Sequence, residues 1–360
     1  MNSQFTKRRR QLAREFERLQ LDCLLVTRAA NWFYLTGFAG ESGVLALEPG
    51  AATLITDGRF TTQAQQETTG VQVRLQKGSL YQSVGEWVHN RGLRRVGYDP
   101  GQWTVTQRAA LKKAAGPKSR PIEAVGLVER LRMTKDPLEL AAMRKAALLA
   151  GSVLESVLAL IKPGVRENEL AAEIEYRMKK SGASGASFET IVASGKRAAF
   201  PHARPTAKRL RKNELVVLDL GAILAHYCSD ITRTVHLGRA SARVRGWYRA
   251  VLDAQEAAVA AVGAGITCGQ VDAAARDVLS KAGLDTYFVH STGHGLGLEV
   301  HEDPRVARGQ NVRLEAGNVI TIEPGVYVEG VGGIRIEDDV AVRSHGSEVL
   351  TRVRRDLIEL

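Results

Sequence analysis

The fold of the larger part of this sequence is decided by two short apolar segments, residues 216–221 (VVLDLG) and residues 320–325 (ITIEPG). Each segment runs into a carboxylate that is followed by one residue and a glycine, so Asp219 and Glu323 occupy equivalent places 104 positions apart. A short run of Val, Leu and Ile is typical of a buried strand. We therefore predict two equivalent strands that each end in an acidic residue.

An amphipathic helix is predicted before each of these strands. Residues 164–182 (GVRENELAAEIEYRMKKSG) align without gaps on residues 265–283 (GITCGQVDAAARDVLSKAG), at an offset of 101. In both stretches apolar residues recur at helical spacing: Leu170, Ile174 and Met178 in the first, and Val271, Ala275 and Leu279 in the second. Two matches at nearly the same offset predict an internal duplication, in which each half supplies a helix and then a strand.

A second acidic residue follows each strand after a turn. Asp230 lies 11 positions after Asp219, and Glu337 lies 14 positions after Glu323. These spacings suit two adjacent strands of a hairpin, so each half should bring two carboxylates side by side. Because the strands are apolar, the carboxylates should be buried, and a buried charge without a partner is costly. The four carboxylates therefore require counter-charges.

Two divalent cations would balance the four negative charges, which favours a binuclear metal centre. Oxygen-rich ligation favours manganese, cobalt or zinc over a thiolate-type site. The candidate nitrogen ligand is His294, because the glycines beside it let the backbone come close to a bound group. His290 and His301 lie in the same stretch, so three of the eight histidines fall within 12 positions.

Each of these residues also has an ordinary structural interpretation. A single acidic residue such as Asp219 is often a turn or capping residue. Glu337 could pair with Arg335, since side chains two apart on a strand point to the same face. His301 could be a surface histidine. The metal-centre hypothesis explains these residues together, whereas the alternatives need unrelated explanations.

The first third of the sequence alternates between helical and strand-like stretches, which predicts a small α/β domain. The predicted helices are residues 5–19, a stretch from about 62, and residues 103–115. The predicted strands are residues 21–27, 44–47, 52–56, 71–75 and 95–99, with a hairpin turn at 48–51. A break at 116–121 and a capped helix start at Asp136 place a boundary near residue 130. We predict a first domain over 1–130 and a second over 131–360.

The composition of the 360 residues, 44% hydrophobic and 25% charged, is that of an ordinary globular protein. No stretch approaches the ~20 apolar residues that span a bilayer, and no apolar segment follows the basic start as in a signal peptide. The three cysteines lie far apart, as expected in a reducing compartment. We therefore predict a cytoplasmic protein with no membrane partner.

The net charge of +11 raises the question of a nucleic-acid partner. Residues 1–130 hold 19 Lys and Arg against 11 Asp and Glu, while residues 131–360 hold 31 against 28. The excess is led by the run at residues 7–10 (KRRR), which is typical of a solvated helix face. Neither a helix-turn-helix pattern nor an aromatic RNA-binding signature accompanies it, so we predict no nucleic-acid partner.

Seven motifs, taken in order, resemble a known family. They are residues 31–38 (NWFYLTGF), 200–202 (FPH), 219–221 (DLG), 229–234 (SDITRT), 293–297 (GHGLG), 323–325 (EPG) and 334–338 (IRIED). The sequence resembles the pita-bread-fold metallopeptidases, in the branch of Xaa-Pro aminopeptidases and Xaa-Pro dipeptidases (prolidases). This resemblance implies an α/β chain with a small creatinase-like N-terminal domain, followed by a pseudo-twofold pita-bread catalytic domain.

The resemblance also implies a set of metal ligands. The five ligands would be Asp219, Asp230, His294, Glu323 and Glu337, with Asp230 and Glu337 bridging two ions. Manganese is the first choice for the two divalent ions, with cobalt or zinc as alternatives. One departure from the family pattern is Ala-His at positions 225–226, where many relatives carry Asp-Gly; we interpret it as a variation of the loop.

The implied activity is hydrolysis of the bond between an N-terminal residue and proline, as in an Xaa-Pro aminopeptidase. The metals would supply an activated water, and Glu323 would accept its proton. His202 and His301 would hydrogen-bond the substrate backbone and the leaving prolyl nitrogen. His290 would stabilise the intermediate or shape the proline pocket, and Arg335 would orient ligands or substrate. The implied partners are a proline-containing peptide and a second copy of the chain, as a homodimer.

Several alternatives remain at this point. A prolidase would use the same site but would need an arginine for the substrate's carboxylate, for which Arg59, Arg197, Arg204 and Arg305 are all candidates. A methionine aminopeptidase would usually lack the first domain. A creatinase-like amidinohydrolase would lack the metal ligands, and so would a non-enzymatic binding module on this fold.

Overall fold

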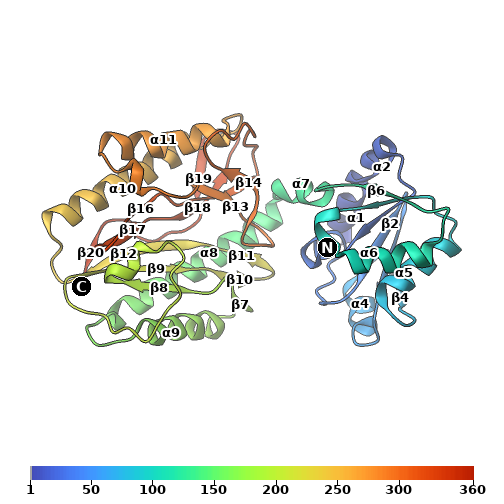
Figure 1. The fold of residues 1–360 in the computed structure, drawn as a ribbon, viewed down its shortest axis with the longest axis horizontal. Coiled ribbons are helices and arrows are strands. Elements are labelled where there is room, and N and C mark those ends of the chain that lie inside the picture. Colours follow the sequence, from blue (N-terminus) through green and yellow to red (C-terminus); the bar gives the residue numbers. More distant parts are fainter. Residues whose placement is uncertain (1) are drawn as a thin grey trace. The chain divides into compact units, whose positions relative to one another are not determined.

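The computed structural model describes residues 2–360, which form two compact units divided between Arg132 and Met133 (Figure 1). Each unit has its own sheets and its own apolar core. Among the helices of residues 2–360, none combines the length and the apolar character needed to cross a membrane.

The first unit is built on a six-stranded sheet with the order β4-β3-β2-β1-β5-β6. Its strands are β1 (Cys23–Val26), β2 (Val44–Glu48), β3 (Ala51–Thr56), β4 (Gln72–Leu75), β5 (Arg95–Tyr98) and β6 (Arg120–Glu123). Its helices are α1 (Asn2–Gln11), α2 (Ala13–Leu19), α3 (Ala29–Thr36), α4 (Thr61–Glu67), α5 (Leu80–Asn90), η1 (Pro100–Gln102), α6 (Val105–Ala115) and α7 (Leu127–Met133). Buried side chains of α5 and α6 pack on strands β1, β2, β3 and β5.

The predicted strands of this unit are all present, and the hairpin β2–β3 turns at Pro49 and Gly50 as expected. The predicted helix at 5–19 is wrong in one respect, because it is divided at Leu12 into α1 and α2. At Leu12 ψ is −17°, and its carbonyl accepts hydrogen bonds from the N–H groups of both Glu15 and Phe16, as in a tight turn. Sequence analysis did not predict α3, α5 or the edge strand β6.

Part of the basic run in α1 is used inside the first unit. Arg8 is buried, with its guanidinium 4.0 Å from the centre of the Tyr34 ring and Nη1 donating to the carbonyl of Tyr34. Arg9 is half-buried and donates to the carbonyl of Leu35. Cation–π contacts and charged hydrogen bonds of this kind stabilise a helix against its neighbour. Two of the four cations in this run therefore have a structural role.

The second unit contains four sheets, with the strand orders β20-β12-β9-β8, β14-β13-β15-β18-β19, β11-β10-β7 and β16-β17. Its early strands are β7 (Gly185–Ala186), β8 (Ile191–Ser194), β9 (Glu214–Leu220), β10 (Ala222–Leu224), β11 (Tyr227–Cys228) and β12 (Ile231–Leu237). Its later strands are β13 (Gly293–Gly295), β14 (Glu302–Val306), β15 (Val319–Ile322), β16 (Gly325–Val328), β17 (Gly332–Arg335), β18 (Asp338–Val342), β19 (Ser347–Val349) and β20 (Ile358–Glu359).

Two helix pairs cover these sheets from opposite sides in Figure 1. They are α8 (Pro137–Val157) with α9 (Glu167–Lys180), and α10 (Ala242–Ala261) with α11 (Cys268–Lys281); the short helices are η2 (Leu158–Leu160), η3 (Gly195–Ala199) and η4 (Asp285–Tyr287). The first pair packs on β8, β9 and β12, and the second on β15, β16, β17 and β18. Helix α8 begins with the predicted capping box of Asp136 and Glu139. The predicted duplication of helix and strand is thus present in the fold.

The two halves meet along equivalent strands. Leu218 lies opposite Arg233 in β9 and β12, and Ile322 lies opposite Asp338 in β15 and β18. Because Leu218 and Ile322 are equivalent in the repeat, Arg233 and Asp338 are equivalent as well. Their side chains form a buried ion pair, with Nη2 and Oδ1 2.8 Å apart. The pseudo-twofold axis that relates the two halves therefore passes close to this ion pair.

The strands that carry the acidic residues are adjacent, but they are not joined by a simple hairpin turn. Strand β9 pairs with β12 and β15 pairs with β18, both antiparallel, as predicted. Between the first two strands lies the small hairpin β10–β11, and between the second two lies β16–β17. Each connection therefore folds into a small hairpin of its own.

Candidate metal centre

The first half brings two carboxylates to the end of the β9–β12 pair. Asp219 is the penultimate residue of β9, and Asp230 immediately precedes β12; both are buried. The N–H of Asp230 donates to Oδ2 of Asp339, 3.1 Å away. Among the described residues, Oδ1 of Asp219 and Oδ1 of Asp230 are buried oxygens without a hydrogen-bond partner. Such oxygens are costly in a folded protein unless a further group binds them.

The second half brings two more carboxylates to the β15–β18 pair. Glu323 follows β15, and Glu337 immediately precedes β18. Oγ1 of Thr232 donates to Oε2 of Glu337 at 2.5 Å, and Oγ1 of Thr321 lies 3.4 Å from Oε1 of Glu323. These hydroxyls fix one oxygen of each carboxylate.

His294 lies on β13 between two glycines that have no room for a side chain. A Cβ atom on Gly293 would be 1.9 Å from the carbonyl oxygen of Thr321, and one on Gly295 would be 2.2 Å from that of Asp303. The glycines therefore allow β13 to lie close to its neighbours, as the sequence suggested. Nδ1 of His294 is 2.9 Å from the carbonyl oxygen of Gly295, which makes Nδ1–H the donor and leaves the lone pair of Nε2 free.

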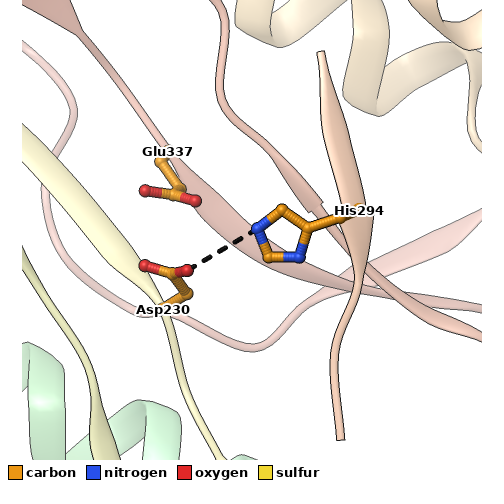
Figure 2. Close-up of side chains that lie close together, drawn as sticks. All are labelled: Asp230, His294 and Glu337. Carbon is orange, nitrogen blue, oxygen red and sulfur yellow. Dashed lines mark ion pairs between the residues drawn. The ribbon is translucent and has the colours of Figure 1, made fainter. Parts of the chain in front are cut away.

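The free Nε2 atom of His294 points into the carboxylate cluster. It lies 3.8 Å from Oδ2 of Asp230 and 3.6 Å from Oε1 of Glu323. Figure 2 shows the ring directed at Asp230, with Glu337 beside them, and one ligand atom from each of these three residues lies within 4.8 Å of the others. Four of the five predicted ligands are thus linked by these distances.

Asp219, the fifth predicted ligand, is linked to the cluster through Arg335. Nη2 of Arg335 donates to Oδ2 of Asp219 at 2.6 Å, and Nε donates to Oγ1 of Thr232, which in turn binds Glu337. Nη1 donates to the hydroxyl of Tyr327 and to the carbonyl of Pro201. The alternative of a direct Arg335–Glu337 pair is wrong, because the guanidinium is taken up by these other partners.

The electrostatics of the cluster favour a bound cation. Burial, followed by the charge of Glu337, raises the pKa of Asp230, and burial, followed by the charge of Glu323, raises that of Glu337. Burial also raises the pKa of Glu323 to about 7. Arg335 supplies one positive charge, so the ionised cluster carries about −3, where the four carboxylates alone would carry −4. Carboxylate oxygens and one neutral imidazole nitrogen form a donor set that fits a divalent metal ion.

His290 is held beside the cluster by a chain of hydrogen bonds. Tyr327 accepts a hydrogen bond from Arg335, so its own proton is directed to Nε2 of His290, 2.8 Å away. Nδ1 of His290 then donates to the carbonyl oxygen of Ser291. Burial and the nearby charge of Arg335 lower the pKa of His290 to about 4. The imidazole is therefore neutral at physiological pH.

The two remaining histidines lie at the exposed side of the cluster. His301 is an exposed residue whose ring centre is 4.4 Å from that of His294, at a steep angle. Burial and the neighbouring His294 lower the pKa of His301. His202 is exposed and follows Pro201, whose carbonyl is held by Arg335. Unlike the ligand residues, His202 has no direct hydrogen bond to the cluster among the described residues.

Three groups that organise this centre were not among the predicted site residues, namely Tyr327, Thr232 and Thr321. Thr321 has a visible signal, because it stands two positions before Glu323, a spacing that places two side chains on the same face of an extended segment. Thr232 lies inside the motif at 229–234, where only Asp230 was singled out. Tyr327 carries no such signal, because its contact with Arg335 arises from the folding of β16 against β17.

The chain is similar to several known proteins over most of its length. It is 35% identical to the Xaa-Pro dipeptidase of Pyrococcus horikoshii, over 94% of this chain and 95% of that protein. The structure of the Xaa-Pro dipeptidase from Bacillus anthracis matches with a TM-score of 0.95 and 38% identity, covering 99% of this chain and 100% of the other. The X-Pro aminopeptidase from Thermotoga maritima matches with a TM-score of 0.89 and 34% identity, over 96% and 100%.

The family comparison agrees with these similarities. Residues 8–134 match the creatinase/prolidase N-terminal domain, and residues 141–344 match metallopeptidase family M24. Together with the structural matches, they confirm the predicted fold class, an α/β chain with a creatinase-type N-terminal domain and a pita-bread catalytic domain. The chain belongs to metallopeptidase family M24 and carries a creatinase/prolidase N-terminal domain.

Proposed function

We propose that the protein is a metal-dependent exopeptidase that hydrolyses the bond between an N-terminal residue and proline. The observation that carries this proposal is the buried cluster of Asp230, His294 and Glu337, in a chain similar to proteins named Xaa-Pro dipeptidase and X-Pro aminopeptidase. Metallopeptidase family M24 itself implies divalent metal ions and a peptide substrate. Proline specificity is what the proposal adds for this chain.

The proposed cofactor is a pair of divalent ions held by Asp219, Asp230, His294, Glu323 and Glu337. The free buried oxygens of the two aspartates and the free nitrogen of the histidine support this assignment. Because four of the five ligands are carboxylates, manganese is the first choice, with cobalt or zinc as alternatives. When bound, the ions supply an activated water and polarise the scissile carbonyl.

The side chains of the cluster divide the remaining tasks of the reaction. Glu323 accepts the proton of the attacking water and later delivers it to the leaving prolyl nitrogen. His202 and His301, on the exposed side, hydrogen-bond the substrate backbone and the prolyl nitrogen. His290 is neutral and donates no hydrogen bond to substrate from Nδ1, so it shapes the proline pocket through its ring. Arg335 holds the carboxylate of Asp219 in one orientation.

The length of the substrate separates two candidate functions. A dipeptidase needs a free cation for the substrate's carboxylate, whereas Arg59, Arg197 and Arg204 each pair with a carboxylate of the chain. This favours an Xaa-Pro aminopeptidase, which accepts longer peptides. The second candidate is an Xaa-Pro dipeptidase, which is favoured by the names of several relatives and by the exposure of Arg305. A non-enzymatic binding module is disfavoured by the presence of all five ligands.

The direct test is removal and return of the metal. The purified protein is dialysed against a chelator, its metal content is measured, and manganese, cobalt or zinc is added back before assay with Xaa-Pro and Xaa-Pro-Yaa-Zaa peptides. We expect no cleavage by the metal-free protein and recovery with manganese. Cleavage of the tetrapeptides identifies an aminopeptidase, and cleavage of the dipeptides alone identifies a dipeptidase. Full activity without metal would refute the proposal.

Two further proposals and two predictions accompany the function. We assign residues 1–130 to the creatinase-like domain and residues 131–360 to the catalytic domain. We propose a homodimer, which light scattering on the purified protein tests. The cytoplasmic location and the lack of a nucleic-acid partner stay predictions, and a salt-dependent shift of DNA mobility would contradict the second.

A further inference from the structure

We propose that two buried carboxylates outside the metal centre, Asp272 and Glu167, are positioning residues for the reaction. Each lies on a helix that packs against the sheets, and each binds a segment that carries one of the predicted substrate histidines. Asp272 holds the segment at 288–294, and Glu167 holds the segment at 194–206. The inference rests on the proposed peptidase function, but its test includes metal binding, which does not depend on the substrate.

Asp272 lies near the start of α11 and contacts both a residue of that helix and a separate segment of the chain. Its side chain is buried, with Oδ1 accepting from Oγ1 of Thr292 at 2.8 Å and from the backbone N–H of Thr292 at 3.3 Å. Oδ2 accepts from Nε of Arg276 at 2.7 Å. An exposed i,i+4 ion pair contributes little to the stability of a helix. This pair, in contrast, is largely buried and fixes a residue of another segment.

The contacts of Asp272 lead directly to two metal ligands. The carbonyl oxygen of Thr292 accepts from the backbone N–H of Glu323 at 2.8 Å, and Thr292 stands two residues before His294. A carboxylate that holds Thr292 therefore determines where the backbones of Glu323 and His294 lie. Residues that contact metal ligands without touching the metal commonly affect the affinity of a site for the metal, because they orient the ligands.

Arg276, the partner of Asp272, also holds the backbone at His290. Its Nη2 atom donates to the carbonyl oxygen of His290 at 2.6 Å, and Nη1 donates to that of Phe288 at 3.3 Å. The guanidinium also lies over the ring of Phe288, 4.3 Å from its centre. Asp272 orients this guanidinium through Nε. The segment is consequently fixed near both of its ends by one acid–arginine pair.

Glu167 makes a comparable set of contacts at the start of α9. Its buried carboxylate accepts through Oε1 from the N–H and the hydroxyl of Ser194, at 2.9 and 2.8 Å. Through Oε2 it accepts from Nε of Arg197 and from the N–H and hydroxyl of Thr206. Arg197 in turn donates to the carbonyl of Arg204. One carboxylate thus joins both ends of the segment that carries His202.

A carboxylate is required at both positions because of the number and kind of donors. Each accepts from a backbone N–H, a hydroxyl and a guanidinium, and a neutral amide would present a donor to one of them. A buried donor without an acceptor is destabilising, because it has lost its hydrogen bonds to water and gains none in the protein. The amide variants Asp272→Asn and Glu167→Gln preserve the size of the side chain but lose the charged hydrogen bond from Arg276 or Arg197. They therefore loosen the segment without emptying the space.

The test for Asp272 measures metal affinity and turnover in Asp272→Asn. The matched control is Asp253→Asn, which removes the exposed i,i+4 partner of Arg249 from α10. We expect manganese to bind the metal-free Asp272→Asn protein about tenfold more weakly, as measured by titration calorimetry, with a similar fall in kcat. The control should match the wild type. The thermal midpoint is recorded so that variants are compared only where they are folded.

The test for Glu167 distinguishes its role from that of Asp272. Glu167→Gln should keep its manganese affinity but lose about tenfold to a hundredfold in kcat/KM, because it moves His202 and no ligand. Its control is Glu173→Gln, which removes the partner of Arg177 on the outside of the same helix. We therefore expect weak metal binding for Asp272→Asn, and normal metal binding with poor turnover for Glu167→Gln.

Two outcomes would overturn the inference directly. Metal affinity and kinetics equal to those of the controls would show that neither carboxylate positions the site. Losses that merely follow the thermal midpoint would show a role in stability alone. If Asp272→Asn does not fold, Arg276→Met is the deciding variant, because it removes the hydrogen bonds to the carbonyls of His290 and Phe288. The inference requires that Arg276→Met lower kcat. If no Xaa-Pro peptide is cleaved by the wild type, the proposed function fails, while the metal titration still tests Asp272.

Discussion

The two halves of the catalytic unit share one order of elements but differ in what their equivalent positions carry. Ser194 lies opposite Val216, and Gly295 lies opposite Ile320, the equivalent of Val216. Ala193, next to Ser194, is therefore the counterpart of His294, next to Gly295. The first half thus has a buried alanine where the second half has the proposed nitrogen ligand.

The acidic residues differ in the same way. Asp219 and Glu323 are equivalent, but the register of the strands makes Thr232, rather than Asp230, the counterpart of Glu337. These two counterparts touch each other, since Thr232 donates to Glu337. The two halves therefore share a backbone arrangement but divide the proposed ligands unequally, with three on the second half and two on the first. The following predictions test that division.

The largest expected effect is on turnover, from the second half. Glu323→Gln should lower kcat by about 10²–10⁴-fold, because the proton acceptor of the proposed reaction is lost. Steady-state assays on Xaa-Pro peptides measure this, with Glu329→Gln in the exposed turn between β16 and β17 as the control. A fall of less than about threefold would mean that another group takes the proton.

The next effect is on stability, at the place where the halves meet. Asp338→Ala should lower the free energy of unfolding by about 3–5 kcal/mol, because it removes the carboxylate partner of the buried Arg233 and the ion pair with Arg355. Urea denaturation measures the change. Asp356→Ala, which removes an exposed partner of Arg354, should cost less than about 1 kcal/mol. Equal losses in the two variants would contradict a special role of the equivalent pair.

A smaller effect is expected from the ligand that the first half lacks. His294→Ala should lose about one equivalent of metal and bind it about a hundredfold more weakly, because the free Nε2 atom is removed. Metal analysis after gel filtration measures the stoichiometry. His301→Ala is the control, since its ring contacts His294 but is not a proposed ligand. Full metal content in His294→Ala would remove this residue from the ligand set.

The smallest effect is expected in the turn that departs from the family pattern. Ala225 and His226 both have positive φ, 48° and 71°, in the two-residue turn between β10 and β11. Asn-Gly suits such a turn, whereas side chains such as these are strained there. The double variant Ala225→Asn, His226→Gly should gain about 1 kcal/mol in stability and raise the thermal midpoint. A lower midpoint would show that contacts of His226 outweigh the strain of the turn.

Much of the fold could be predicted because its signals are local. The capping box at Asp136 and the apolar periodicity of the helices are readable within a few residues, and they agree with α8, α9 and α11. Other elements were missed although a signal existed. Helix α5 follows Ser79 as its N-cap and buries Val84 and Val88 at helical spacing. The split of the first helix at Leu12 has no comparable signal in the sequence.

The candidate site was predictable only in part. Each of the five proposed ligands stands beside a recognisable pattern, an apolar strand or a glycine pair, and the structure brings four of them together by direct distances. The contacts that organise them were not foreseeable. Arg335 was expected beside Glu337 on spacing alone, but it binds Asp219, which is 116 positions away. Side chains that meet across different sheets leave no periodicity in the sequence.

The sequence by itself determined the duplication, the residue types of the proposed metal centre and the family, because strands, helices and motifs are encoded in local patterns. Only the tertiary structure decided which positions of the two halves are equivalent, which oxygens stay free and which buried groups hold the histidine segments. These properties depend on strand register and on contacts between residues far apart in the chain, such as Asp272 with Thr292 and Arg233 with Asp338. A shift of one residue in register would reverse every side chain of a strand, and the sequence does not record that choice.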